Sequence, residues 1–144
     1  MIVIADSSGV IAASDRRVSE HAECLRVLNQ AGLVVVSPLV LAEVGHIAGK
    51  RLGKGPRAAI LDFIVTQVRR MRFVVPETDI SVLERAIRVQ RRYAGLNLDL
   101  ADAVNVALAS VYRTDVLLTL DRRDFRAVRP LTGHKAFRLL PDDL

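Results

Sequence analysis

The sequence predicts an α/β protein in which helices cover both faces of a central, mostly parallel sheet of four to five strands. Short apolar, β-branched runs alternate along the chain with longer segments of helical periodicity. These runs show no alternation with polar residues, which is typical of parallel strands buried on both faces. Strands separated by helices of this length indicate parallel crossovers. The length of 144 residues is that of one domain, so we expect residues 1–144 to form a single unit.

The first half of the chain is expected to hold two strands and the helices around them. In order, these are a strand at 2–5, a turn at 7–9, a helix from residue 10, a helix at 21–31, a strand at 33–36, a helix at 38–47 and a basic loop at 49–55. Leu25 and Leu28 share one face of the second helix, and Gly32 follows where a C-cap belongs. Ser37 precedes Pro38 in the order typical of an N-cap and the first helical residue.

The second half continues the same alternation. Helices are expected at 56–70, 79–92 and 100–112, strands at 73–75 and 116–118, and an edge strand at 136–139. Ile60, Ile64 and Val68 lie on one stripe of the first of these helices, as helical periodicity requires. Pro76 closes the third strand, because proline cannot donate a hydrogen bond to a neighbouring strand.

Composition restricts the class of protein. Hydrophobic residues make up 51% of the chain, which excludes a disordered protein. A single cysteine, Cys24, excludes an internal disulfide scaffold and a cysteine-rich zinc site. No apolar stretch reaches the ~20 residues of a membrane span, and the first residues lack the basic segment of a secretory signal. We therefore expect a cytoplasmic protein with no membrane partner.

The charge balance points to an anionic partner. Lys and Arg number 21 against 16 Asp and Glu, which gives a net charge of +5 and an isoelectric point near 10.1. Most basic residues are arginines, whose planar guanidinium matches phosphate, although a genome rich in arginine codons would give the same composition. Aromatic residues are only 4%, so contacts to nucleic acid would use phosphates rather than stacked bases. The candidate phosphate contacts, which could equally be solvated surface, are Lys50, Arg51, Lys54, Arg122 and Arg123.

Two acids follow predicted strands directly. Asp6 comes after the first strand and Asp121 after the fourth. The carboxyl ends of parallel strands share one edge of a sheet, where ligands bind in this fold class, so both acids are expected to face one crevice. One such Asp alone would indicate a turn or a helix cap, but two at strand ends weaken that interpretation. Glu43 is a third candidate, because helical spacing places it on an apolar face beside Val40 and Val44; a salt bridge to an arginine is the alternative.

A fourth acid lies in the segment 97–103, where spacing does not choose between Asp99 and Asp102. Asp99 could cap the next helix, and Asp102 could be an acid that the helix dipole favours.

Two carboxylates ~4 Å apart repel by about 4 kcal/mol at an effective dielectric of about 20, so a cluster of them needs a cation. Oxygen ligands without His or Cys select Mg²⁺ or Mn²⁺, and such an ion activates water toward a phosphodiester.

Other catalytic signatures are missing from the sequence. It contains no GxGxxG, GxxxxGK[ST] or GxSxG pattern, which excludes a dinucleotide site, a P-loop and a hydrolase nucleophile elbow. A phosphoaccepting receiver domain would need paired acids after the first strand, where Asp6 stands alone.

Four short motifs contain the candidate acids. They are IADSS at 4–8, VSPLVLAE at 36–43, LDLADAVNVALA at 98–109 and LTLDRRDF at 118–125. Each is modest alone, whereas all four in this order over the full chain are specific. Together they resemble the motifs of the PIN domain, and in particular those of the VapC toxins of bacterial VapBC toxin–antitoxin pairs. Ser7 replaces the threonine that is commoner after the first Asp.

The resemblance implies a PIN-like fold and a metal-dependent endoribonuclease that uses Mg²⁺ or Mn²⁺. The implied catalytic and metal-binding residues are Asp6, Glu43, Asp102 and Asp121. It selects Asp102, which is followed by alanine and the helix, and leaves Asp99 as a cap or an outer acid. By its place in the first motif, Ser8 is a candidate to hydrogen-bond Asp121 or metal-bound water.

The family also implies partners. It implies a homodimer, an RNA substrate of the tRNA or ribosomal RNA class, and a cognate VapB-type antitoxin whose C-terminal segment blocks the site. Apolar surface near residues 56–70 is a candidate to receive that segment, although a role in the core is the default interpretation of those side chains. The alternatives are a non-catalytic PIN-like protein that binds RNA or a partner, and a nuclease that acts on DNA. The presence of all four acids favours a nuclease over a binding protein.

Overall fold

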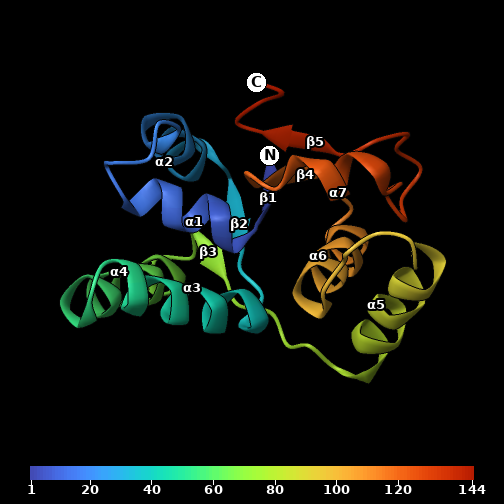
Figure 1. Ribbon diagram of the computed structural model, residues 1–144, viewed down its shortest axis with the longest axis horizontal. Helices are drawn as coiled ribbons and strands as arrows, with labels where there is room; N and C mark the ends of the chain where they lie inside the picture. The colour runs from blue at the N-terminus through green and yellow to red at the C-terminus, as the bar shows by residue number, and fades with distance from the viewer.

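The computed structural model describes residues 1–144 as a five-stranded sheet with seven helices (Figure 1). The strands are β1 (Ile2–Ala5), β2 (Leu33–Val35), β3 (Phe73–Val74), β4 (Val116–Leu118) and β5 (Arg138–Leu140). The helices are α1 (Ser7–Ser14), α2 (His21–Gln30), α3 (Pro38–Arg51), α4 (Lys54–Arg69), α5 (Ile80–Arg92), α6 (Leu100–Val111) and α7 (Arg122–Ala127). The strand order is β3-β2-β1-β4-β5, and every neighbouring pair is parallel. None of the helices is both long enough and apolar enough to cross a membrane.

β1 lies at the centre of the sheet and determines where the acids are placed. Ile4 is in register with Val35 of β2 on one side and with Leu117 of β4 on the other. Backbone pairing continues past the strand, since the N–H of Asp6 donates to the carbonyl of Leu118 at 2.9 Å. All five strands therefore present their carboxyl ends at one edge, as the sequence predicts.

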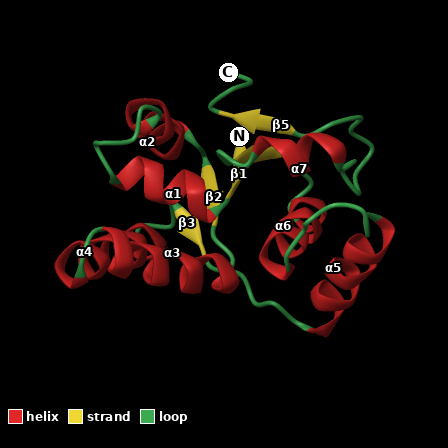
Figure 2. Cartoon of the chain, in the orientation of Figure 1, coloured by secondary structure: helices red, strands yellow, loops and turns green.

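Alternate strand residues face opposite sides of the sheet and define two hydrophobic cores. Val3, Ala5 and Val34 pack with residues of α1 to α4, whereas Ile4 and Val35 pack with residues of α5 to α7. Figure 2 shows the strands between these two groups of helices. The predicted three-layer α/β/α arrangement is confirmed.

The turn predicted at 7–9 was wrong, because α1 begins at Ser7 directly after β1. Asp6 has an extended backbone and is the N-cap residue, so the strand passes into the helix without a loop. Gly9 lets the first turn of α1 approach β4: a Cβ at this position would lie 2.6 Å from the side chain of Leu118 and 2.7 Å from its carbonyl oxygen. This close approach brings Ser8 to the end of β4.

The basic loop predicted at 49–55 was also wrong. α3 continues through Lys50 and Arg51, and α4 begins at Lys54. The reversal between them uses Gly53, whose φ of 100° favours glycine. Both helices persist because their apolar faces pack in the same core, and such packing outweighs the glycine content of the segment.

Candidate active site

Five acids from four separate parts of the chain lie at the carboxyl edge of the sheet. Asp6 follows β1, Asp121 follows β4, and Glu43 lies in the second turn of α3. Asp99 and Asp102 begin α6. Because their charges act on one another's pKa values, we treat these five residues as one acid cluster.

Burial and the charges of neighbouring acids make four members of the acid cluster hard to ionise. For Asp102, burial followed by the charges of Asp99, Asp6 and Asp121 raises the pKa from 3.8 to about 8. Burial also raises the pKa of Glu43, with further contributions from the charges of Asp99 and Asp6. Burial is the main cause that raises the pKa of Asp6 and of Asp121. A positive charge placed among these carboxylates would therefore be strongly favoured.

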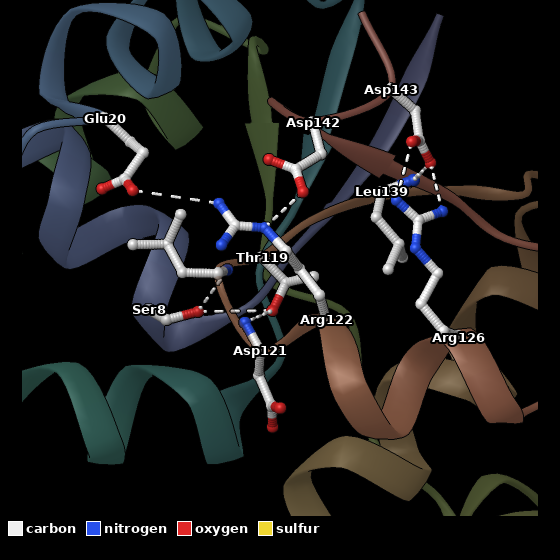
Figure 3. A network of polar contacts seen from close by, with 10 residues as sticks. Ser8, Glu20, Thr119, Asp121, Arg122, Arg126, Leu139, Asp142 and Asp143 are labelled. Atoms are coloured by element: carbon white, nitrogen blue, oxygen red, sulfur yellow. Dashed lines mark hydrogen bonds and ion pairs between the residues drawn. The ribbon is translucent and has the colours of Figure 1, made fainter.

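Two hydroxyl groups hold the buried carboxylate of Asp6. Thr119 Oγ1 donates to Asp6 Oδ2 at 2.8 Å, and Ser8 Oγ donates to the same oxygen at 3.3 Å. Thr119 Oγ1 in turn accepts from the N–H of Asp121 at 3.0 Å, and Ser8 Oγ accepts from the N–H of Leu120 at 2.9 Å. Figure 3 shows the bonds that join Ser8, Thr119 and Asp121. The bonds tie the ends of β1 and β4 together and lower the pKa of Asp6 against the effect of burial.

The structure changes the role expected for Ser8 and adds Thr119. Ser8 was expected to bond Asp121 or metal-bound water. Its hydroxyl bonds Asp6 and the backbone of Leu120 rather than Asp121, and a bond to metal-bound water stays a prediction. Thr119 was not predicted, although it is fully buried at the end of β4. The available signal was a polar residue that ends an apolar strand two positions before Asp121.

Asp99 and Asp102 form a reciprocal capping box at the start of α6. The carboxylate of Asp99 accepts from the N–H of Asp102 at 2.9 Å, and the carboxylate of Asp102 accepts from the N–H of Asp99 at 3.4 Å. The capping interpretation of both residues is therefore confirmed. It coexists with membership of the acid cluster, because the start of α6 lies at the same edge of the sheet.

No basic side chain neutralises the acid cluster. None of its five members forms an ion pair within 4.0 Å, so the salt bridge considered for Glu43 is not formed. Arg122 follows Asp121 directly, but its guanidinium pairs with Asp142 at 2.6 Å and with Glu20 at 3.9 Å. The Asp121 carboxylate points away from that guanidinium (Figure 3).

The donor atoms of the acid cluster suit a hard divalent cation. They are carboxylate oxygens without histidine or cysteine, which is the ligand set of Mg²⁺ and Mn²⁺. No three His, Cys, Asp or Glu side chains of the chain converge closely enough to hold an ion in their present orientations. Repulsion between unpaired carboxylates favours this separation.

A cleft of about 140 Å³ opens beside the acid cluster. Ser7, Ser8 and Leu120 are among its lining residues, within two positions of Asp6 or Asp121 in the sequence. Of the basic residues predicted to contact phosphate, Arg51 lines this cleft. Three more of these basic residues are exposed and form no ion pair: Lys50, Lys54 and Arg123. Arg122 is the exception, because it is ion-paired.

Comparison with known proteins identifies the family. Residues 3–130 match the PIN domain. The chain belongs to the PIN domain family. Ribonuclease VapC26 of Mycobacterium tuberculosis is 34% identical to this PIN-domain chain over 142 residues, which cover 96% of the chain and 100% of that protein. The matched PIN region contains all five members of the acid cluster, whereas β5 follows it.

Crystal structures support the same fold. The VapC20 toxin of Mycobacterium tuberculosis, described as cleaving the sarcin–ricin loop, has a TM-score of 0.71 at 18% identity and covers 83% of this chain and 89% of its own. VapBC2 of Rickettsia felis, bound to a DNA fragment from its promoter, has a TM-score of 0.68 at 17% identity and covers 92% of this chain and 96% of its own. At these identities the likeness establishes the PIN fold.

Proposed function

We propose that this PIN-domain protein is the toxin of a type II toxin–antitoxin pair and acts as a cytoplasmic, metal-dependent endoribonuclease. The relative that supports the activity is Ribonuclease VapC26, which matches nearly the whole chain. The observation that carries the proposal is the acid cluster itself. It gathers carboxylates from four parts of the chain and offers them no cationic partner, and the pKa values of Asp6, Glu43, Asp102 and Asp121 are raised there.

The residues of the proposed site divide into metal ligands and residues that position those ligands. The residues that would hold Mg²⁺ or Mn²⁺ are Asp6, Glu43, Asp102 and Asp121. A bound ion supplies activation of water and neutralisation of phosphate charge during hydrolysis. Thr119 and Ser8 fix the orientation of Asp6 through their hydroxyls. Asp99 holds the first turn of α6, and with it Asp102, in place.

The proposed partners are RNA and a VapB-type antitoxin, and we expect the toxin to be a homodimer. VapBC2 of Rickettsia felis and a toxin–antitoxin complex from Klebsiella pneumoniae are among the structural relatives. A groove of about 220 Å³ lies between α1, α2 and α4, where apolar surface was expected to receive the antitoxin. Leu25, Leu28 and Ile60 contribute to it, and Phe63 lines it with 36% of its surface exposed.

The test is cleavage of RNA and DNA oligonucleotides of the same sequence by purified protein. We expect RNA to be cut at internal positions with Mg²⁺ or Mn²⁺ and to remain intact with EDTA. Asp6→Asn and Asp121→Asn should abolish cleavage while circular dichroism shows a folded protein.

Three outcomes would contradict the proposal. Cleavage at the wild-type rate by Asp121→Asn would remove the acid cluster from the chemistry. RNA binding without metal-dependent turnover would favour the non-catalytic alternative. Equal cleavage of DNA would contradict a ribonuclease.

A further inference from the structure

A row of three arginines runs along α5. Arg85, Arg88 and Arg92 are separated by three and four residues, so they share one side of the helix. The row extends over ~10 Å at the α-helical rise of about 1.5 Å per residue. Val82, Ala86 and Val89 bury another side of α5 in the core, which fixes the orientation of the row.

No ion pair within the protein neutralises the charges of the row. None of the three arginines forms an ion pair. Glu84 is four residues before Arg88, the spacing of a helical ion pair, yet the two are not paired. Arg85 donates only to the hydroxyl of Ser110, at 3.3 Å. Three unpaired guanidinium groups side by side repel one another, so an anion that bridges them would be favoured.

The row lines a cleft of about 280 Å³. Its other wall includes Leu131, from the segment that follows α7. This segment is joined to the end of α5, because the N–H of Arg129 donates to the hydroxyl of Tyr93 at 3.0 Å. The guanidinium of Arg92 lies 5.7 Å from the centre of the Tyr93 ring. The arginines therefore face a defined concave surface.

The α5–α6 hairpin connects the row to the acid cluster. Gln90 near the end of α5 donates to the carbonyl of Leu98 just before α6 at 3.1 Å, while Arg85 reaches Ser110 near the end of α6. The two helices are thus antiparallel, and they lie side by side in Figure 1. The Arg92 end of the row is at the end of the hairpin where α6 begins with Asp99, and the Arg85 end lies away from it.

We infer that Arg85, Arg88 and Arg92 bind consecutive phosphates of the RNA substrate, on the flank of the site where it is cut. This inference rests on the proposed function and extends it. The planar guanidinium matches phosphate geometry, and neighbouring phosphates of one strand would follow the length of the helix. The row contributes affinity without reading bases, because the cleft offers arginine and aliphatic side chains but no aromatic platform.

The experiment compares two triple substitutions that remove the same charge. The α5 set combines Arg85→Gln, Arg88→Gln and Arg92→Gln. The control set, which is the second set, combines Arg16→Gln, Arg26→Gln and Arg69→Gln. The second set is exposed, makes no ion pair and lies in or beside α1, α2 and α4, on the other side of the molecule from α5 in Figure 1. Both sets are made in the Asp121→Asn background, so that binding of a fluorescein-labelled RNA hairpin is measured by anisotropy without cleavage. Binding is measured over a series of salt concentrations.

We expect the α5 set to weaken RNA binding and to reduce the slope of log affinity against log salt by about 2 to 3, at about 0.7 to 0.9 per phosphate contact. The control set should retain the slope of the parent protein. Equal losses in the two sets, or no loss in either, would overturn the inference. So would loss of binding to an acidic antitoxin peptide with RNA binding intact, since the row would then serve a protein partner.

Two further measurements keep the result interpretable. If the α5 set unfolds, the double substitution Arg88→Gln and Arg92→Gln replaces it, because neither residue donates a hydrogen bond within the protein, whereas Arg85 bonds Ser110. Cleavage by the protein with Asp121 intact separates this inference from the proposed function. Row-dependent RNA binding with no cleavage contradicts only the endoribonuclease activity. Normal cleavage with RNA binding that does not depend on the row contradicts only the inference.

Discussion

Thr119→Val is the substitution that most specifically disturbs the proposed site. Valine has nearly the shape of threonine, so the change removes a hydroxyl without opening a cavity. The hydroxyl donates to the Asp6 carboxylate at 2.8 Å and accepts from the Asp121 N–H at 3.0 Å. Thr119 is 0% exposed, so water does not replace these bonds at the hydroxyl position. Asp6 would lose its strongest hydrogen bond and Asp121 would lose the bond that positions its backbone.

The expected cost follows from the type of each bond. A hydrogen bond to a charged group contributes about 1.5–3 kcal/mol, and a neutral one about 0.5–1.5 kcal/mol. We therefore expect Thr119→Val to lower the free energy of unfolding by about 2–4 kcal/mol at neutral pH. For a domain of this size, a loss of about 3 kcal/mol corresponds to a fall of about 6–12 °C in Tm.

The loss should depend on pH. Burial already raises the pKa of Asp6 above its unfolded value of 3.8, and the Thr119 hydroxyl opposes that rise. In Thr119→Val the folded-state pKa of Asp6 rises further, so ionised Asp6 destabilises the variant more than the wild type. As the pH falls through the folded-state pKa of Asp6, the carboxyl becomes protonated and the difference between the proteins shrinks. Only the contribution from the Asp121 N–H should then remain.

Thr114→Val is a matched control at the opposite end of β4. Thr114 lies before β4, where its hydroxyl donates to the carbonyl of Ile2 at 2.7 Å and accepts from the N–H of Val116 at 3.2 Å. The wild type, Thr119→Val and Thr114→Val are unfolded with urea at several pH values in EDTA, and their RNA cleavage is measured with Mg²⁺. We expect Thr114→Val to lose about 1–3 kcal/mol independently of pH and to keep its cleavage activity. The reasoning is refuted if Thr119→Val matches this control in both measurements.

Two other substitutions test the packing around the site. Gly9→Ala should destabilise the protein by about 1–3 kcal/mol, because the added Cβ would lie 2.6 Å from the side chain of Leu118 and force α1 away from β4. A Tm equal to that of the wild type would contradict the close approach. Asn105→Leu should raise the free energy of unfolding, measured with urea, by about 1–2 kcal/mol, because both polar atoms of the Asn105 side chain are buried without a partner in the protein. A loss of stability would contradict this and show that the amide is paired.

The sequence predicts the sheet and its acids well because both follow from local patterns. A run such as Ile2–Ala5 has no polar residue to expose to solvent, which is typical of a strand buried on both faces of a sheet. Parallel pairing then places the residue after each strand at one edge, which brings Asp6 and Asp121 together from opposite ends of the chain. Asp102 could be selected over Asp99 only by resemblance, since both residues lie at the start of α6 and cap each other.

The details that the sequence did not predict depend on contacts between distant residues. Thr119 matters because β4 lies beside β1, and no local pattern states which hydroxyl meets Asp6. Arg122 was a candidate for RNA contact, but it forms ion pairs with Glu20 and Asp142. These acids lie more than a hundred positions before it and twenty positions after it in the sequence, so no local pattern predicts the pairs. The helices at 49–55 extend because tertiary packing outweighs the local preference of glycine for a loop.

The acid cluster is tested most directly by the effect of Mn²⁺ on thermal unfolding of the wild type and of Asp102→Asn. Burial and three neighbouring acids raise the folded-state pKa of Asp102 to about 8 from 3.8, so its contribution to stability falls as the pH rises through this window. Without metal at alkaline pH, we expect Asp102→Asn to be more stable than the wild type by about 1–2 kcal/mol, allowing for solvent screening of this partly exposed group. Added Mn²⁺ should raise the Tm of the wild type and leave that of Asp102→Asn nearly unchanged. A wild-type Tm that does not respond to Mn²⁺, or an equal rise in the variant, would contradict a divalent-ion site built from these acids.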